Sequence, residues 1–382
     1  MMIAIDGNEA NIENRVGSNE YAFKLLIHLF KEIKDLRLKG NKPDFKCIVY
    51  LKDQPLSDLP AKTDWWQYRV LKPKILWTRW RLPLELVLNK KNIDVFFTPG
   101  HYSPLICPAP LVMAIMDLAF LRFPDQFRKK DLYKLIKWTK DSVKKAAHII
   151  AISEFSKKEI VNLYNYPSGK ITVVYPGTTK LKEEKQESFK SLKSKYKLQG
   201  KYFFYLGTLQ PRKNLLKLIE AFKKLSLKYS NYQLVVAGKK GWLYDDIFKK
   251  VGELNLKDKI VFTDYISKGE KNVLLKNSQS LVLPSLYEGF GIPVLEAMQL
   301  GCPVIISNTS SLPEVGGEAA LYINNPESVD CIYQALEKMV ELNLNEREKL
   351  IKLGFEQIKK FSWEKSAQKV LKELKYASRT SS

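Results

Sequence analysis

The chain has 382 residues, of which 45% are hydrophobic, so it is long enough to form two globular domains with sizeable cores. It contains no uninterrupted apolar run near the roughly 20 residues of a membrane-spanning helix. Its N-terminus lacks the basic segment and apolar region of a signal peptide, and its scattered cysteines lack metal-ligand spacing. We therefore expect a cytoplasmic protein with free, buried thiols.

The formal net charge of +22 favours anionic partners. Nucleic acid, an anionic membrane surface and an anionic small-molecule substrate would all suit this charge. Because lysine is spread along the whole chain and nothing resembles a nucleic-acid-binding motif, we expect no nucleic-acid partner.

The first half of the sequence alternates short apolar strands with amphipathic helices. A strand at 3–5 is followed by a loop that contains Gly17, and a helix is expected from about Ser18 to Lys34. The later elements of this half are strands at 45–51, 93–98, 110–116, 148–152 and 171–174, and helices at 127–147 and 153–164. This alternation predicts an α/β domain over residues 1–178.

Two segments of the first half mix basic and apolar side chains. One holds four tryptophans among arginines and lysines: Trp65, Trp66, Trp77 and Trp80. In the helix expected at 127–147, Leu132, Leu135, Ile136, Thr139 and Val143 should face inward, and lysines should face outward. For the tryptophan segment, a helix that packs its tryptophans on the sheet is one explanation and a sugar-binding platform is another; for the helix at 127–147, a solvated basic face is the first explanation. A peripheral contact with an anionic membrane, at its inner face, is the alternative.

The second half begins the same pattern again, with a strand at 202–206, a loop at 207–214 and a helix at 215–229. Arg212 and Lys213 fall at the expected N-terminus of this helix, where positive side chains oppose the helix dipole. A bound anion would resolve that conflict, so both residues are candidates for holding one. We expect the second domain to span 179–360, followed by a last helix at 361–376 and a frayed tail at 377–382.

The segment from residue 281 to 306 is predicted to form strand, loop, helix and strand. The loop contains Glu288, Gly289 and Gly291, and Pro293 suits the first turn of the helix. We expect Glu296 in that first turn. Each glutamate alone is explained by a solvated loop or by the helix dipole. Two carboxylates beside glycines at the end of a buried strand instead favour binding of hydroxyl groups.

The segment Glu288-Gly-Phe-Gly-Ile-Pro-Val-Leu-Glu296 resembles the E-x7-E signature of retaining, nucleotide-sugar-dependent glycosyltransferases of family 4, group 1. The resemblance implies an α/β GT-B fold. In that fold two Rossmann-like domains, for acceptor and nucleotide sugar, face each other across a cleft, and the C-terminal helix crosses back to the first domain. The segment 207–214 is similar to mannosyltransferases of surface polysaccharide assembly, which makes GDP-mannose the first donor to consider.

The resemblance also implies roles for individual residues. Arg212 and Lys213 would stabilise the leaving diphosphate, and Glu288 would hold the hydroxyls of the transferred sugar. Asp117 follows Met116, which stands where the family places a histidine near the reacting carbon. The remaining donor-binding candidates are Gly17, Gly207, Thr208, Gly289, Phe290, Gly291, Glu296 and Tyr265. No Asp-x-Asp pair occurs, so we expect neither an obligatory metal nor a cofactor besides the nucleotide-sugar co-substrate.

These features predict an enzyme that moves a hexose to a saccharide or lipid-linked acceptor in cell-surface glycan synthesis. Two alternatives remain at this stage. Glu288 and Glu296 could be the acid and nucleophile of a glycoside hydrolase. The chain could also be a non-catalytic nucleotide-sugar-binding protein, or a basic protein that binds membranes or nucleic acid.

Overall fold

The computed structural model describes residues 1–15, 17–40, 44–178, 187–241 and 244–379. The chain forms two compact units, the first made of Met1–Gly177 with Phe361–Ser382 and the second of Thr178–Lys360. The sequence placed the domain boundary after residue 178, at the start of a polar segment. Most of that boundary segment, 179–186, and the last part of the expected tail, 380–382, lie outside the described residues.

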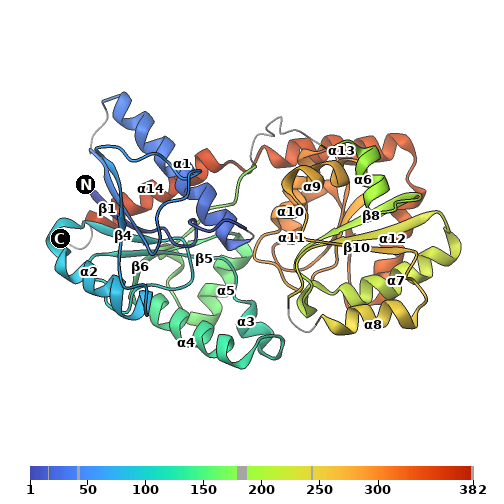
Figure 1. Ribbon diagram of the computed structural model, residues 1–382, viewed down its shortest axis with the longest axis horizontal. Helices are drawn as coiled ribbons and strands as arrows, with labels where there is room; N and C mark the ends of the chain where they lie inside the picture. Colours follow the sequence, from blue (N-terminus) through green and yellow to red (C-terminus); the bar gives the residue numbers. More distant parts are fainter. Residues whose placement is uncertain (16, 41–43, 179–186, 242–243, 380–382) are drawn as a thin grey trace. The chain divides into compact units, whose positions relative to one another are not determined.

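The first unit is built on a seven-stranded sheet whose pairings are all parallel, in the order β3-β2-β1-β4-β5-β6-β7 (Figure 1). Its strands are β1 (Met2–Asp6), β2 (Lys46–Leu51), β3 (Trp66–Val70), β4 (Val95–Thr98), β5 (Leu111–Ile115), β6 (Ala146–Ala151) and β7 (Ile171–Val173). The chain proceeds from β1 to one side and from β4 to the other. The carboxyl ends of β1 and β4 therefore form the topological switch point of this sheet, where open α/β sheets bind ligands.

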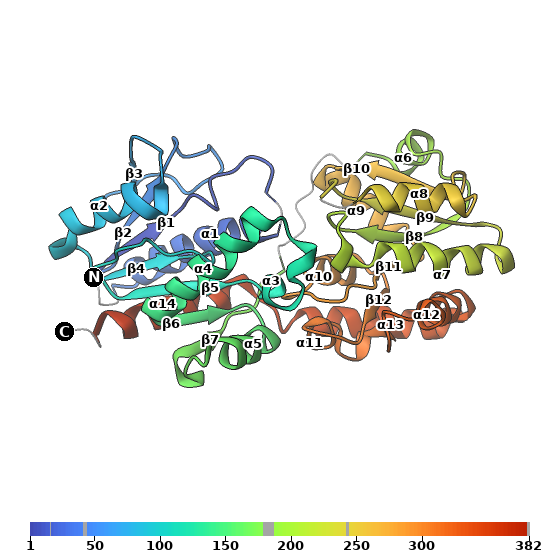
Figure 2. The ribbon, with the colours of Figure 1, turned by 90° about the horizontal axis from the view of Figure 1, so that it is seen from below.

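Helices cover both faces of this sheet (Figure 2). They are α1 (Ser18–Leu38), α2 (Leu82–Leu88), α3 (Ala119–Arg122), α4 (Lys129–Lys145), α5 (Glu154–Tyr164) and α14 (Trp363–Arg379), with a π-helix η1 (Trp77–Arg81) leading into α2. The return of the last helix to the first unit is confirmed, because Trp363 packs against Tyr21 of α1 with ring centroids 5.5 Å apart. The helix does not end near residue 376 as predicted. It continues to Arg379, and Ala377, which was expected in the frayed tail, is buried.

The second unit has a six-stranded sheet, again with parallel pairings only, in the order β10-β9-β8-β11-β12-β13. Its strands are β8 (Lys201–Leu206), β9 (Tyr232–Ala237), β10 (Ile260–Asp264), β11 (Ser280–Leu283), β12 (Val304–Ser307) and β13 (Ala320–Ile323). Its helices are α6 (Phe189–Lys195), α7 (Leu215–Lys228), α8 (Asp245–Glu253), α9 (Lys268–Lys276), α10 (Ile292–Gln299), α11 (Leu312–Gly316), α12 (Val329–Glu341) and α13 (Leu344–Ile358). Here the switch point lies between β8 and β11.

Several elements differ from the sequence prediction. Strands β3 and β13 and helix α13 were not predicted. Trp66, the first residue of β3, was assigned to an aromatic, basic segment, and α13 buries little apolar surface. Ile136 is exposed rather than inward-facing, since α4 buries its C-terminal half through Thr139, Ser142 and Val143. Two of the free cysteines, Cys107 and Cys331, are only partly buried. No helix in the described ranges has the length and apolar content to cross a membrane.

Candidate active site

The loops after β8 and β11 meet at the switch point of the second sheet. These strands are neighbours, with Phe203 paired to Ser280. The backbone N–H of Leu286 donates to the carbonyl of Arg212 at 2.8 Å. The side chain of Asn214 donates to the carbonyl of Pro284 at 3.1 Å. These bonds fix the two loops against each other, so the side chains on one loop have defined positions relative to those on the other.

Two cations and one carboxylate converge between these loops. Lys213 Nζ lies 2.5 Å from Glu288 Oε1, and Arg212 Nη1 lies 3.9 Å from Glu288 Oε2. Arg212 also donates to the carbonyl of Tyr287 at 3.0 Å, but its buried Nε–H has no acceptor among the described residues. Among these three side chains, two are positively charged and one is negatively charged. Little-exposed cations with an unused donor suit an anionic ligand such as a diphosphate.

The electrostatics of Glu288 follow from this arrangement. Burial alone would raise the pKa of its carboxyl group. The charges of Lys213 and Arg212, with hydrogen bonds from Lys213 and Ser285, outweigh burial and lower the pKa below its ordinary value. Glu288 is therefore ionised at neutral pH, and an ionised carboxylate accepts hydrogen bonds but cannot donate a proton.

Arg212 and Lys213 do not lie at the N-terminus of α7, as the sequence suggested. Arg212 and Lys213 belong to a short 3₁₀ turn, Pro211–Lys213, rather than to the first turn of α7. Asn214, with a φ of +60°, separates that turn from the helix. The two side chains also have a structural partner in Glu288, which the sequence argument did not consider. What favours an anion is the pair of little-exposed cations with an unused donor, and not a conflict with the dipole of α7.

A serine-rich segment after β12 holds the loop that carries Glu288. The hydroxyl of Ser311 donates to the carbonyls of Glu288 and Phe290, both at 2.9 Å. The backbone N–H of Glu288 donates to the hydroxyl of Ser310 at 3.0 Å, and Ser285 donates to the Glu288 carboxylate at 2.8 Å. Sequence analysis missed these serines. Ser285 follows β11, and Ser310 and Ser311 follow β12, so their place after buried strands at the ligand-binding edge was the signal that could have identified them.

Helix α10 begins at Ile292, so the prediction that Glu296 lies in its first turn is wrong. Glu296 lies in the second turn and forms an ion pair with Lys271 of α9, at 2.5 Å. Pro293 is in the first turn as expected. Gly291 has a φ of +109°, and a Cβ there would lie 2.8 Å from the side chain of Leu312, so this position requires glycine.

The other donor-binding candidates of the second unit vary in exposure. Phe290 is buried, so only its backbone can reach a ligand, together with that of Gly289. Gly207 and Thr208 follow β8, and Gly207 donates to Ala237 at 3.0 Å. Tyr265 follows β10 and is half exposed, with Lys239 Nζ 4.8 Å from its ring centroid. All of them lie at the carboxyl edge of the same parallel sheet.

Three predicted residues belong to the first unit. Gly17 precedes α1 with a φ of +53° and a ψ of −115°, a conformation that suits glycine. Met116 is buried after β5, which agrees with a packing role. Asp117 accepts a hydrogen bond from the backbone of Ala119 at 3.0 Å and so supports the start of α3. These three residues belong to the first unit, whereas Glu288 belongs to the second.

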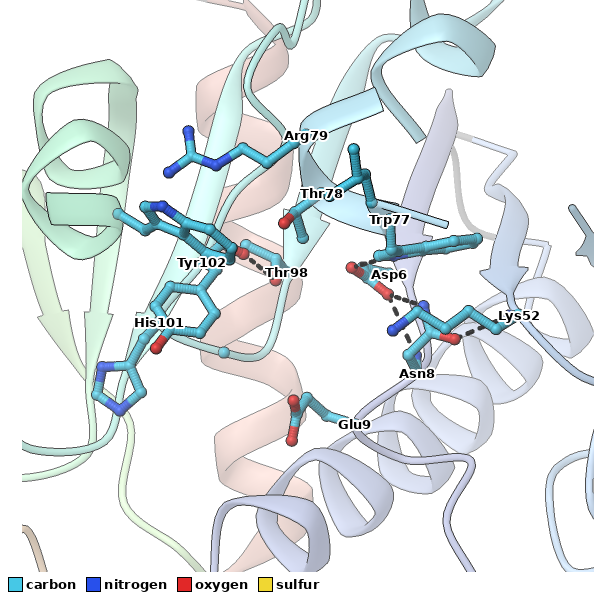
Figure 3. Close-up of a pocket in the computed structure, with 13 residues that line it drawn as sticks. Asp6, Asn8, Glu9, Lys52, Trp77, Thr78, Arg79, Thr98, His101 and Tyr102 are labelled. Carbon is cyan, nitrogen blue, oxygen red and sulfur yellow. Dashed lines mark hydrogen bonds between the residues drawn. The ribbon is translucent and has the colours of Figure 1, made fainter. Parts of the chain in front are cut away.

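The first unit has its own pocket, of about 260 Å³, at the carboxyl ends of β1 and β4 (Figure 3). Asp6 and Glu9 point into it from the end of β1 and the loop that follows. The indole N–H of Trp77 donates to Asp6 at 3.0 Å, and the Asn8 side chain donates to Asp6 at 2.7 Å. The rest of the lining is Lys52, Leu76, Thr78, Arg79, Thr98, Gly100, His101, Tyr102 and Trp138. Sequence analysis missed this site because its parts are far apart in the chain.

The titrating groups of this pocket are shifted by burial. Burial raises the pKa of Asp6 even though Trp77 and Asn8 donate hydrogen bonds to it. Burial and the neighbouring charge of Asp6 raise the pKa of Glu9. Burial also lowers the pKa of His101, and Asp117 offsets this only in part. The lining thus offers carboxyl groups that bind protons more tightly and an imidazole that stays neutral, a set suited to hydroxyl groups.

Two doubly wound parallel units, with a cation–carboxylate cluster at the switch point of the second, define a glycosyltransferase of the GT-B class. Family comparisons agree with this class. The model described as "Glycosyltransferase Family 4" matches residues 55–179, and the model described as "Glycosyl transferases group 1" matches residues 184–357. The chain belongs to this group 1, family 4 class of glycosyltransferases.

Curated relatives cover much of the chain. It is 33% identical over 377 residues to an Escherichia coli "O-antigen chain mannosyltransferase B", covering 91% of this chain and 93% of the relative. It is 31% identical over 247 residues to "O-antigen chain mannosyltransferase RfbU" of Salmonella typhimurium, covering 64% of each chain.

Solved structures show the same fold at low sequence identity. Sucrose-phosphate synthase from Thermosynechococcus elongatus aligns with a TM-score of 0.71 at 18% identity, covering 97% of both chains. WaaG, described as a glycosyltransferase involved in lipopolysaccharide biosynthesis, aligns with a TM-score of 0.68 at 14% identity, covering 98% of this chain and 99% of WaaG.

Proposed function

We propose that this glycosyltransferase transfers a hexose, with retention of anomeric configuration, from a nucleotide-diphosphate sugar to a saccharide or lipid-linked acceptor. The single observation that carries the proposal is the cluster of Arg212, Lys213 and Glu288 at the switch point of the second sheet. GDP-mannose is the proposed donor and cell-surface glycan the proposed product. The relatives named as O-antigen mannosyltransferases support mannose as the sugar and a surface glycan as the product. The choice of GDP rests on the resemblance of segment 207–214.

In the proposed reaction the bond between the anomeric carbon and the diphosphate oxygen breaks, and a bond to the acceptor oxygen forms on the same face. Arg212 and Lys213 stabilise the charge that develops on the leaving diphosphate. Glu288 accepts hydrogen bonds from hydroxyls of the transferred sugar, and Glu296 from those of the ribose. The proton of the attacking hydroxyl passes to the leaving diphosphate, so neither a metal ion nor a separate base is required.

The pocket of the first unit is the proposed acceptor site. Asp6 and Glu9 can accept hydrogen bonds from sugar hydroxyls, and the ring of Tyr102 offers an apolar face for a pyranose. His101 supplies a neutral imidazole to this pocket, whereas Met116 has no group that can donate a hydrogen bond. In this proposal Asp117 contributes through its charge near His101 and through the start of α3.

A hydrolase that uses Glu288 as its proton donor is disfavoured, since the neighbouring cations lower the pKa of this carboxyl group. A non-catalytic nucleotide-sugar-binding protein has one observation in its favour. The buried Met116 stands where the family places a histidine. The two possibilities differ in whether the sugar–phosphate bond is broken, which turnover measurements decide.

The experiment that tests the donor is a thermal-shift screen of GDP-mannose, UDP-glucose and ADP-glucose, with and without a metal chelator. A donor at a hundred times its dissociation constant adds about 2.7 kcal/mol to the free energy of unfolding. We expect GDP-mannose to stabilise the protein most, with no effect of the chelator. Absence of stabilisation by any nucleotide sugar would overturn the proposal.

A further inference from the structure

An unusual amount of apolar surface is exposed between residues 75 and 88 of the first unit. Leu76, Trp80, Leu84 and Leu88 are 64%, 48%, 42% and 72% exposed. They are spaced by four residues. Leu76 directly precedes η1, whereas Trp80 in η1 and Leu84 and Leu88 in α2 fall on one face of this helical segment. We call these four residues the apolar stripe. Ile75 and Val87, 64% and 40% exposed, flank it.

The opposite face of the same segment is packed into the protein. Trp77, Leu82 and Leu86 are buried in the core of the first unit. The segment is therefore anchored by its inner face, and the stripe is not the by-product of a loosely attached helix. Contiguous apolar surface of this kind on a folded unit indicates a binding surface.

Basic residues surround the stripe. Between residues 72 and 91 the chain carries six basic residues and one acidic residue, Glu85, which pairs with Arg69 and Arg81. From outside this range, Asp53 pairs with Lys72 and Lys74, and Asp141 lies 3.9 Å from Arg79. The basic residues are Lys72, Lys74, Arg79, Arg81, Lys90 and Lys91. Helix α4 lies beside η1, because Arg79 stacks on Trp138 of α4 with 4.2 Å between the guanidinium carbon and the ring centroid. Exposed lysines of α4 extend the positive surface.

A second apolar feature lies beside the same helix. Leu105 and Ile106 are 40% and 55% exposed, and the backbone N–H of Leu105 donates to the carbonyl of Thr78 in η1 at 2.7 Å. Lys145 of α4 donates to the carbonyl of Leu105 at 2.5 Å. The stripe thus has an apolar neighbour that is itself bordered by a lysine.

We infer that the apolar stripe inserts among the lipids of an anionic membrane surface while the exposed lysines around it bind the head groups. Apolar side chains inside a basic border are the arrangement of interfacial helices. A second copy of the chain would bring an equally positive border against this one, and nucleic acid offers no apolar region for the stripe. The charge pattern therefore favours lipid.

The functional meaning of this membrane contact rests on the proposed function, because it concerns the proposed acceptor site. Leu76 belongs to the stripe and also lines the pocket of the first unit, together with Trp77, Thr78 and Arg79. The docked membrane would therefore lie beside the proposed acceptor site, which suits an acceptor carried on a lipid. The sequence analysis treated Trp77 and Trp80 together as possible membrane contacts. Trp77 is buried and its indole N–H donates to Asp6, so only Trp80 is exposed enough to reach lipid.

The test is co-sedimentation of the full chain with vesicles of phosphatidylglycerol mixed with phosphatidylcholine, beside vesicles of phosphatidylcholine alone. We expect binding that needs the anionic lipid, weakens with salt and falls at least tenfold in a Leu84→Ser/Leu88→Ser variant. The matched control is Leu227→Ser/Leu344→Ser, which removes leucines of the second unit that are 75% and 79% exposed. Equal losses in both variants, or equal binding by wild type and stripe variant, would overturn the inference.

A second measurement locates the contact without a loss of binding. Vesicles with brominated acyl chains should quench the tryptophan fluorescence of the wild type, and a Trp80→Phe variant should lose most of that quenching. Quenching that survives this substitution would also contradict the inference. Both readouts are independent of turnover, so a vesicle-binding protein without transferase activity would refute the proposed function and leave the docking surface intact. Self-association through the stripe would appear as a dimer without vesicles and would contradict the inference.

Discussion

The two switch points of this molecule have the same topology and opposite chemistry. At the β8/β11 edge of the second unit, Arg212 and Lys213 hold a carboxylate whose pKa is lowered. At the β1/β4 edge of the first unit, the pKa values of Asp6 and Glu9 are raised by burial. Parallel strands supply the same kind of ligand-binding edge in both cases. The difference lies in the loop residues and not in the fold, and under the proposed function these residues decide whether an edge receives an anion or hydroxyl groups.

The largest expected effect concerns the cations of the second unit. Arg212→Ala or Lys213→Ala should lower kcat/KM for the donor by roughly 10²-fold or more, since each removes a charge contact to the leaving diphosphate. Steady-state transfer from GDP-mannose measures it. Lys217→Ala is the control, because this lysine of α7 is partly exposed and pairs with Glu220. Near-normal turnover in both variants would contradict the proposal that Arg212 and Lys213 bind the leaving diphosphate.

The two carboxylates should differ in which kinetic constant they affect. Glu288→Gln should lower kcat by about tenfold to a hundredfold, because its contacts are made to the reacting sugar. Glu296→Gln should mainly raise the donor KM, by about tenfold, because ribose binding is similar in the ground and transition states. Reversed effects would mean that the two roles are exchanged.

The first-unit pocket gives a prediction on the acceptor side. Glu9→Gln should raise the KM for a mannose oligosaccharide acceptor by about tenfold, the scale of one hydrogen bond to a charged group. The affinity for GDP-mannose, measured by calorimetry, should not change. A change in donor affinity with a normal acceptor KM would mean that this pocket binds the donor, and would contradict the proposed acceptor site.

A further prediction concerns the pH dependence of stability. The folded-state pKa of Glu288 is depressed, so the carboxylate stabilises the second unit fully above the ordinary glutamate value of 4.5. That contribution should be lost as the pH falls below 4.5. Glu288→Gln should therefore cost about 3 kcal/mol of unfolding free energy at pH 7, the scale for breaking a buried ion pair, and less at pH 4. Chemical denaturation at both pH values measures the difference, and an equal cost at both would contradict the ion pair.

The sequence predicted most of what lies close together along the chain. The strand, glycine loop and helix around Glu288 were legible because turn residues and buried strands follow each other within 20 positions. Contacts over longer separations were not. The bond between Trp77 and Asp6 and the pairing of Lys213 with Glu288 join residues 71 and 75 positions apart. Strand β3 was missed because Trp66, its buried first residue, was assigned to an aromatic, basic segment.

Tertiary contacts also decided how individual side chains are used. The pattern of 127–147 predicted an inward-facing Ile136, yet packing of the C-terminal half of α4 leaves this residue exposed. The four tryptophans were treated as one group, whereas burial separates Trp80 from Trp65, Trp66 and Trp77. Which apolar side chain remains exposed depends on neighbours that periodicity does not reveal.

The central claim is that the protein breaks the sugar–phosphate bond of its bound donor and keeps the anomeric configuration. Proton NMR of the anomeric region, recorded during transfer from GDP-α-mannose to a mannose oligosaccharide, tests it most directly. We predict that an α-linked product signal grows as GDP-mannose disappears, and that the rate falls by about 10²-fold in Lys213→Ala. A β-linked product, or a donor that binds and stays intact with every acceptor offered, would contradict it.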